Sequence, residues 1–456
     1  MAHFPRGHKK LLRAWIFYDW ANSVYSLTIV SAVFPIFYGL LFKIAGITHI
    51  HLFGIEFKNT AVIAFVTALA FLAVVILAPI LSGIADYLGN KKTFMKFFCY
   101  LGAISCIGLY WFSLENIYVG LLAYFGGVVG FWGSIVFYNS YLPDVALPEQ
   151  YDDVSAKGFI MGYLGCTLLL IFNLAMVMYP SYFGIGGDEV AATQKAMRIS
   201  FVTVGIWWIA FSQYSFWYLP KFEKERGKIT KSIVFNGHKE LREVWKKLKN
   251  SNRLKAYLFA FFVYSMGVQT VMLVAAYFGE QEVQWKTDDE KTIGLIVSIL
   301  IIQLVAILGA KLTVLCVKKI GKIPVLIVLN CIWISICIIA YFVIFPTHFY
   351  ITAVLVGLVM GGIQTLSRST YSAYLPETKD TTSFFSFYDV TEKIGIIIGM
   401  GIYGIIDQLT NSMRNSVVFL IFFFAAGVFL LIKVLKLERL HKKNQELQTE
   451  HNNHSV

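Results

Sequence analysis

Apolar stretches of about 20 residues recur along the whole of this 456-residue chain. A stretch of that length crosses the hydrocarbon core of a bilayer as a helix, because lipid offers backbone N–H and C=O groups no partner and a helix pairs them internally. Only 14% of the residues are charged, against about 25% in an ordinary soluble protein. A membrane β-barrel would instead show short alternating segments. We therefore predict an all-α membrane protein with twelve spans, at 14–42, 59–84, 93–114, 117–142, 156–183, 196–219, 254–279, 292–316, 323–345, 349–375, 384–409 and 416–437.

The net charge of +12 is unevenly distributed over the predicted loops. Lysine and arginine gather at the start, after the second span, in a central segment at 220–255 and after the eighth span, while the intervening loops carry few bases. This alternation follows the positive-inside rule. We expect both termini and the long central loop to be cytoplasmic, with the lipid bilayer rather than nucleic acid as the partner of these charges.

Catalytic and metal-binding patterns are absent from the sequence. The six cysteines lie in apolar stretches and form no CxxC pair, so they predict neither disulfides nor a metal site. All nine histidines lie outside the predicted spans, and the sequence contains no HExxH, P-loop or GxSxG motif. We expect no cofactor, no metal and no catalytic residue, which makes an intramembrane enzyme the less favoured reading.

Two blocks of sequence occur once in each half of the chain. Tyr138-Asn-Ser-Tyr141-Leu142-Pro143 recurs as Tyr371-Ser-Ala-Tyr374-Leu375-Pro376. Downstream, Tyr151-Asp152 with Gly158 and Gly162 matches Tyr388-Asp389 with Gly395 and Gly399. Six spans are thus followed by six of the same orientation. The duplicated GxxxG pairs predict close helix–helix approach in both halves.

The loop after the second span fits a specific pattern, G-x-x-x-D-x-x-G-x-[KR]-[KR], with Gly83, Asp86, Gly89, Lys91 and Lys92 at its fixed positions. It resembles the signature loop of the major facilitator superfamily. The resemblance implies a fold of two six-helix parallel repeats, in which this loop latches the cytoplasmic side and the carboxylate faces a helix N-terminus. In the second half Lys318 stands where Asp86 stands in the first, so we expect one latch to dominate.

Other stretches narrow the resemblance. Tyr18-Asp19-Trp20-Ala21-Asn22-Ser23 in the first span is similar to the autophagy-related vacuolar effluxer family, as are the stretches 158–165, 361–369 and 384–388. The family pattern has an acidic residue in the seventh span where this chain has Met266, which removes the carboxylate that a proton-carrying role there would need. The resemblance implies export of amino acids or related small solutes, coupled to protons or passive.

Ionisable side chains inside a span are costly and mark functional sites. Asp19 and Arg368 lie at similar depths in spans 1 and 10, which line the cavity of the facilitator fold. We predict that the two pair as a gate or coupling site, with a static structural pair as the alternative. Asp389, Glu392 and Lys393 join the predicted coupling or gate set, although ordinary ion pairing near a helix start would also explain them.

Neutral polar and aromatic groups near mid-depth are the candidate substrate contacts. Such groups suit a zwitterion, peptide or sugar-like solute better than a bare ion. We expect a monomeric secondary transporter of an amino acid, peptide or related metabolite, coupled to protons, in a bacterial inner membrane or, in a eukaryote, a vacuolar membrane. A lipid or glycolipid flippase on the same fold is the alternative. The predicted substrate-binding residues are Asn22, Tyr25, Trp132, Tyr138, Tyr264, Gln269, Gln303 and Gln364.

The predicted domain organisation follows these boundaries. A cytoplasmic N-terminus (1–13) precedes the first six-helix bundle (14–219), and a basic linker (220–253) joins it to the second bundle (254–437), before a cytoplasmic tail (438–456). Within the linker, residues 238–250 place apolar residues at helical spacing among bases, which predicts an amphipathic helix on the membrane surface.

Overall fold

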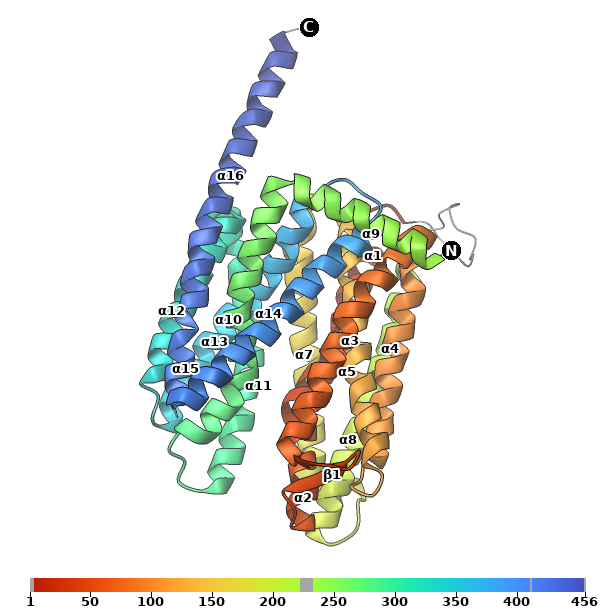
Figure 1. The fold of residues 1–456 in the computed structure, drawn as a ribbon, viewed down its shortest axis with the longest axis vertical. Helices are drawn as coiled ribbons and strands as arrows, with labels where there is room; N and C mark the ends of the chain where they lie inside the picture. The colour runs from red at the N-terminus through yellow and green to blue at the C-terminus, as the bar shows by residue number, and fades with distance from the viewer. Residues whose placement is uncertain (1–3, 222–232, 411, 455–456) are drawn as a thin grey trace. The chain divides into compact units, whose positions relative to one another are not determined.

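The computed structural model describes residues 4–221, 233–410 and 412–454 (Figure 1). The stretch 222–232 of the predicted basic linker and both extreme ends of the chain lie outside the described residues. The regular elements of the described residues are helices, apart from one short antiparallel hairpin in the loop predicted at 43–58. The predicted all-helical class is confirmed.

The first half of the chain begins with one long helical segment that changes its winding. The helix α1 (Lys9–Val24) continues through a π-helical stretch, η1 (Tyr25–Ala32), into α2 (Val33–Ala45). The remaining elements of this half are β1 (His49–Leu52), β2 (Ile55–Lys58), α3 (Asn59–Leu88), α4 (Lys91–Gly108), η2 (Leu109–Trp111), α5 (Ile117–Ser140), α6 (Leu142–Val145), η3 (Pro148–Gln150), α7 (Tyr151–Met178), η4 (Pro180–Phe183) and α8 (Glu189–Tyr218).

The second half begins with the predicted amphipathic helix and ends with a helix that continues through the predicted cytoplasmic tail. Its elements are α9 (Ile233–Asn250), α10 (Asn252–Glu282), α11 (Asp288–Ile320), α12 (Lys322–Tyr341), α13 (Pro346–Tyr374), α14 (Thr381–Thr410), α15 (Met413–Phe419) and α16 (Ile421–His454).

Eleven helical segments of the described chain are long and apolar enough to cross a membrane. The 30-residue α14 is not one of the eleven. It carries the charged residues Asp389, Glu392, Lys393 and Asp407. The multi-pass character is therefore confirmed, whereas the count of twelve spans and the side on which the termini lie stay predictions.

The chain divides into two compact units, and each sequence half gives a short segment to the other unit. The first unit contains Met1–Gln150, Lys157–Leu241 and Lys379–Val390, and the second contains Tyr151–Ala156, Arg242–Thr378 and Thr391–Val456. The start of α14 thus belongs to the first unit, and the start of α7 belongs to the second. The domain boundaries expected from the sequence stay a prediction.

Glycines set the tightest helix contacts within each unit. In the first unit a Cβ on Gly130 of α5 would collide with the backbone of Gly102 in α4. In the second unit a Cβ on Gly361 of α13 would collide with the carbonyl of Ala306 in α11. Because glycine has no Cβ, the two backbones can approach closely, and these helix pairs pack at short range.

The duplicated glycine motifs have equivalent places in the two units. Gly162 of α7 faces the Ser23 hydroxyl of α1 in the first unit. In the second unit Gly399 of α14 faces the Thr270 hydroxyl and the Met266 carbonyl of α10. The close approach predicted from the repeated GxxxG pairs is confirmed at these positions, and Met266 itself is a buried packing residue of α10.

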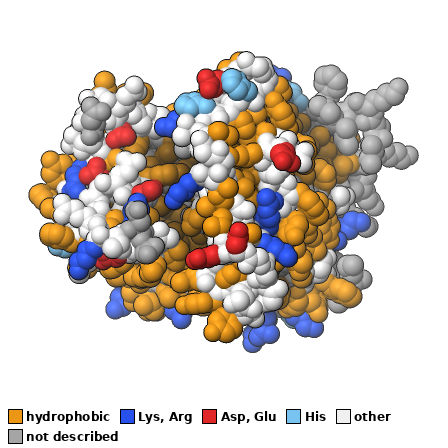
Figure 2. All heavy atoms as spheres, turned by 90° about the horizontal axis from the view of Figure 1, so that it is seen from below, with side chains coloured by type: hydrophobic (Ala, Val, Ile, Leu, Met, Phe, Trp, Pro, Cys, Tyr) orange, Lys and Arg blue, Asp and Glu red, His pale blue; other side chains and the backbone are white. Residues whose placement is uncertain are grey.

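The end of the molecule that carries the β1–β2 hairpin is seen in Figure 2. Charged side chains of both signs are scattered singly or in small groups over this face, among hydrophobic ones. Such a mixture is compatible with the loops that the sequence analysis expects on the outer side.

Candidate functional site

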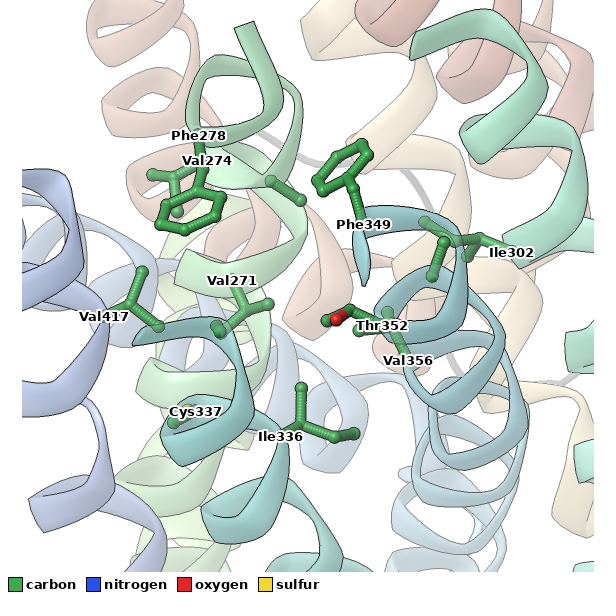
Figure 3. A pocket seen from close by; sticks show the side chains of 13 residues that line it. Val271, Val274, Phe278, Ile302, Ile336, Cys337, Phe349, Thr352, Val356 and Val417 are labelled. Atoms are coloured by element: carbon green, nitrogen blue, oxygen red, sulfur yellow. The ribbon is translucent and has the colours of Figure 1, made fainter. Parts of the chain in front are cut away.

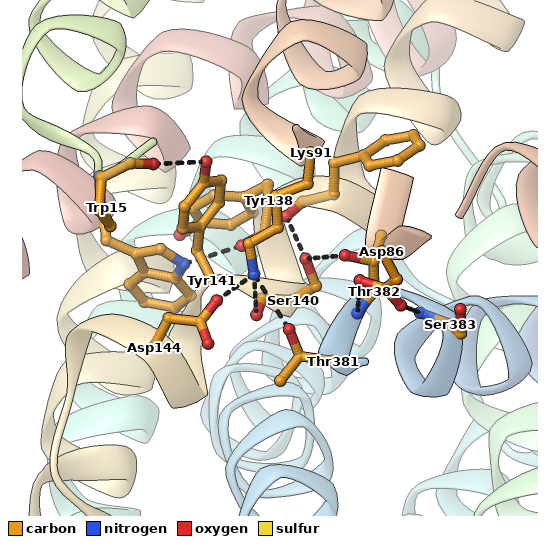
Figure 4. Close-up of polar contacts among 12 residues, drawn as sticks. Trp15, Asp86, Lys91, Tyr138, Ser140, Tyr141, Asp144, Thr381, Thr382 and Ser383 are labelled. Carbon is orange, nitrogen blue, oxygen red and sulfur yellow. Dashed lines mark hydrogen bonds and ion pairs between the residues drawn. The ribbon is translucent and has the colours of Figure 1, made fainter. Parts of the chain in front are cut away.

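A buried carboxylate at the end of α3 caps the start of α14. Asp86 is 4% exposed, and its carboxylate accepts hydrogen bonds from the backbone N–H groups of Thr382 (3.3 Å) and Ser383 (2.7 Å) (Figure 4). The first N–H groups of a helix have no acceptor within the helix, and the helix dipole favours a negative charge beside them. The expected contact of this carboxylate with a helix N-terminus is confirmed, while its role as a latch stays a prediction.

Lys91 at the start of α4 lies in the same polar cluster. Its buried ammonium donates to the Ser140 carbonyl (3.0 Å) and the Thr381 hydroxyl (3.0 Å), and it forms an ion pair with Asp144. It also lies 4.3 Å from the ring centroid of Tyr141. A buried cation is tolerated only when its donors are satisfied, so this cluster holds the turn and the start of α14 together (Figure 4).

The other residues of the signature loop shape the turn. Gly89 ends α3 with φ +67°, in the left-handed region that glycine adopts without a steric cost. Buried Lys92 donates to the Leu219 carbonyl at the end of α8 (2.7 Å). Gly83 lies within α3.

At the corresponding turn of the second half, a lysine takes the place of the acid and contacts an acidic residue at a helix start. Gly321 has φ +89° between α11 and α12, as Gly89 has between α3 and α4. The next residue, Lys322, forms an ion pair with Asp152 in the first turn of α7 (3.0 Å). Here the turn supplies the cation and the helix start supplies the acid, whereas Lys318 is exposed.

Arg368 of α13 binds the start of α7 within the second unit. The residue is 4% exposed; its Nε donates to the Ser155 hydroxyl (3.0 Å) and its Nη2 donates to the Ser155 carbonyl (3.0 Å). The Ser155 hydroxyl in turn donates to the Thr365 carbonyl (3.0 Å). The guanidinium therefore anchors the short segment that the first half of the chain gives to the second unit.

Asp19 of α1 is fixed by an aromatic pair in the first unit. Its carboxylate accepts a hydrogen bond from the Tyr138 hydroxyl (2.7 Å), and the Trp15 indole donates to the Tyr138 carbonyl (2.9 Å). Trp15 also stacks on Tyr138, with ring centroids 4.6 Å apart (Figure 4). Asp19 and Arg368 belong to different units, and the pairing expected of them stays a prediction.

A second charged cluster lies on α14 and α10. Lys393 has a fully buried side chain, and its ammonium lies 2.8 Å from the Glu392 carboxylate. The Gln269 amide donates to the other oxygen of Glu392 (2.8 Å). The structure thus brings together three residues from the predicted coupling and substrate sets. Asp389, also buried, precedes them by one turn on α14.

Two tyrosines that face Ser367 extend the polar network of α10. The Tyr264 hydroxyl lies 2.8 Å from the Ser367 hydroxyl, and the Tyr257 hydroxyl donates to the Ser367 carbonyl (2.9 Å). Tyr264 was predicted from the sequence as a substrate contact, whereas Tyr257 and Ser367 were not. All three are buried, and the serine stands beside Arg368 in the sequence motif that carries the family resemblance.

The remaining predicted substrate residues are dispersed over both units. In the first unit Tyr25 stacks on Phe131 at 4.9 Å with no exposed surface, and Asn22 accepts a hydrogen bond from its neighbour Ser23. Trp132 of α5 packs near Phe71 of α3. In the second unit Gln364 lies 3.6 Å from the Met272 sulfur and Gln303 is half-buried on α11. Their roles in substrate binding stay predictions.

A small pocket of about 50 Å³ lies in the second unit (Figure 3). Its lining is apolar apart from Thr352, whose hydroxyl donates to the His348 carbonyl of its own helix. A polar solute would find no suitable hydrogen-bond partner there. The predicted substrate residues do not line this pocket, which is formed by Val271, Val274, Ala275, Phe278, Ile302, Ile336, Cys337, Ala340, Phe349, Thr352, Ala353, Val356 and Val417.

Comparison with known proteins assigns these features to a family. The model of the family described as "Vacuole effluxer Atg22 like" matches residues 7–151 and 147–445. The chain is 31% identical over 426 residues to the uncharacterized MFS-type transporter YxiO of Bacillus subtilis, covering 92% of this chain and 93% of that protein. It is 25% identical to autophagy-related protein 22 of Yarrowia lipolytica, over 65% of this chain and 52% of that longer protein.

Solved structures support the fold. The crystal structure of the major facilitator transporter FucP in its outward conformation superposes with a TM-score of 0.65 at 12% identity, covering 93% of this chain and 98% of that one. The relatives named above are transporters or effluxers rather than enzymes. The chain is a multi-pass membrane transporter of the major facilitator type and belongs to the vacuole effluxer Atg22-like family.

Proposed function

We propose that this protein is a secondary active transporter that moves a small polar solute, such as an amino acid or a related metabolite, by alternating access with protons as the coupling ion. The observation that carries the proposal is the cluster of Glu392, Lys393 and Gln269 in the second unit, in which the Lys393 side chain is fully buried and those of Glu392 and Gln269 are half-buried. Charges at such a place are costly and are retained where they act.

The chemistry of this cluster suits a zwitterion. Glu392 and Lys393 neutralise each other when the site is empty, and they can exchange that contact for the ammonium and the carboxylate of an amino acid. Protonation of Glu392 would remove one negative charge beside the buried Lys393 ammonium. Removing a charge from a buried ion pair is unfavourable, so proton uptake would be linked to binding of the substrate carboxylate.

The contacts at the helix starts support alternating access. Asp86 holds the start of α14, and Arg368 and Lys322 hold the start of α7. These bonds hold the short segments that each sequence half gives to the other unit, and they do not involve long packed helix faces. The difference in free energy between the bonded and the released state is therefore a few kilocalories per mole.

Uptake into proteoliposomes under an imposed pH gradient tests the coupling. We expect Glu392→Gln to bind the substrate more weakly but to keep exchange at saturating substrate, and to lose accumulation driven by the gradient, because the amide cannot take up a proton. The matched control is Glu377→Gln, which removes an exposed acid. Accumulation by Glu392→Gln equal to that of the wild type would refute coupling through this residue, and the same assay on Asp19→Asn tests the site predicted from the sequence.

The apolar pocket of the second unit favours one other candidate, a lipid or glycolipid flippase. Its lining of aliphatic and aromatic side chains suits a small apolar part of a lipid rather than a polar solute. Movement of fluorescent lipids between leaflets of proteoliposomes, without solute uptake, would establish this function in place of the proposed one.

A further inference from the structure

The helix α9 is covalently held at the membrane boundary. A single residue, Ser251, separates it from α10, whose first residue, Asn252, begins a membrane span. At 1.5 Å per residue, positions 242–249 lie within about 15 Å of that boundary along the chain. The part of α9 in the second unit, from Arg242 onward, turns away from the axis of α10 (Figure 1), so its side chains stay near one depth instead of leading away from the bilayer.

The side chains from Arg242 to Lys249 of α9 are arranged in two stripes. Val244 and Leu248, one turn apart, are 0% and 4% exposed and pack onto the protein. Trp245 is 53% exposed, although it is the largest apolar side chain of this segment. Arg242 and Lys249 lie three residues before and four residues after Trp245, on the same helix face, and both are exposed. Exposed Lys246 follows next around the helix.

This order of side chains matches the profile of a membrane interface. Tryptophan concentrates at headgroup depth, where its ring is half apolar and half polar. Bases beside it attract the phosphates of anionic lipids. A helix face turned only toward water would gain nothing from an exposed indole, since burying that ring is favourable.

We propose that the face of α9 formed by Arg242, Trp245, Lys246 and Lys249 binds the headgroups of anionic phospholipids in the bilayer around the protein. The indole lies among the headgroups, and the three cations pair with lipid phosphates. This interaction is independent of the proposed substrate and coupling ion, because it uses none of their residues.

Fluorescence quenching by brominated lipids tests the proposal on the full-length protein in detergent. The emission of the wild type minus that of Trp245→Phe isolates the signal of this indole. We expect dibrominated phosphatidylglycerol to quench it at concentrations about fivefold lower than dibrominated phosphatidylcholine, the effect of even one base at a charged lipid surface. Salt should weaken the preference, because it screens exposed charges.

Two matched variants test whether the basic residues of this α9 face cause the preference for phosphatidylglycerol over phosphatidylcholine. Arg242→Gln/Lys246→Gln/Lys249→Gln should make the two lipids quench equally. The control Lys43→Gln/Lys58→Gln/Lys286→Gln removes the same charge from exposed positions outside α9 and should keep the preference. Equal quenching by both lipids in the wild type would overturn the proposal, as would no quenching by either, which would leave this face for a protein partner. Both variants should elute as the wild type does in gel filtration.

Discussion

Substitution of Asp86 provides a graded test of the contact that holds the start of α14. Asp86→Ala removes the acceptor of two backbone N–H groups, one at 2.7 Å and one at 3.3 Å. A helix cap contributes about 1 kcal/mol, and a hydrogen bond to a charged group contributes about 1.5–3 kcal/mol. Counting the longer bond as weak, the loss is about 2–3 kcal/mol in the free energy of keeping this segment in place.

The Asn variant separates charge from shape. Asp86→Asn keeps one oxygen that can accept from Ser383 but loses the charge that the helix dipole favours, at a cost of about 1 kcal/mol. Since about 1.4 kcal/mol corresponds to a factor of ten, opening of the first turn of α14 should rise about fivefold in Asp86→Asn and roughly 30- to 150-fold in Asp86→Ala.

Hydrogen exchange over residues 379–390 measures that opening directly, because an amide exchanges when its local contact breaks. The control is Asp188→Asn, which alters a cap of the same type at the exposed start of α8, where the Asp188 carboxylate accepts from the Ala191 N–H (2.7 Å). It should leave exchange at 379–390 unchanged. Exchange in Asp86→Ala equal to that of the wild type would show that the carboxylate does not hold this segment, and transport at the wild-type rate by a variant with faster exchange would refute its role as a latch.

Two further predictions follow from contacts within the second unit. Asp152→Lys and Lys322→Asp should each slow transport in proteoliposomes, because each variant places like charges together. The double variant, which reverses the pair, should restore at least half of the rate if the ion pair acts as a unit. A double variant slower than both single variants would contradict this. Gly399→Val should lower the midpoint of thermal unfolding in detergent, since its side chain would collide with α10 near Thr270 at a cost of about 1–3 kcal/mol. Gly401→Val is the control on the same helix because space is open around it, and equal losses in both variants would point to helix propensity instead of packing.

The sequence predicted that the Asp86 carboxylate contacts a helix start, but it did not predict which residues donate hydrogen bonds to it. The signature loop defines its own turn, since Gly89 adopts a positive φ that few residues tolerate. Thr382 and Ser383 lie almost 300 residues further along the chain, and no local pattern connects a carboxylate with backbone N–H groups at that separation. Tertiary contacts of this type become visible only in the fold.

The ion-pair partner of Lys91 could have been predicted from the sequence. The repeated block ends in Leu-Pro followed by an acid in both copies, Asp144 in the first and Glu377 in the second. A duplicated acid beside a basic turn is a signal for an ion pair. The substrate set was harder to predict, because a polar residue of a membrane helix bonds a neighbouring helix as readily as a solute, as Tyr264 does with Ser367.

The two equivalent turns should respond differently to their surroundings, because they hold their helix starts by different interactions. Asp86 is 4% exposed and binds backbone N–H groups, which do not titrate and carry no full charge for salt to screen. The Lys322–Asp152 pair joins two side chains that are 21% and 16% exposed, so salt and water compete for it. The substitution of lysine for aspartate that the sequence shows at position 318 therefore does not simply remove the second contact. It accompanies an ion pair at Lys322, four residues further along the chain, so high salt should weaken this contact at the start of α7 while the buried bonds from Arg368 to Ser155 remain.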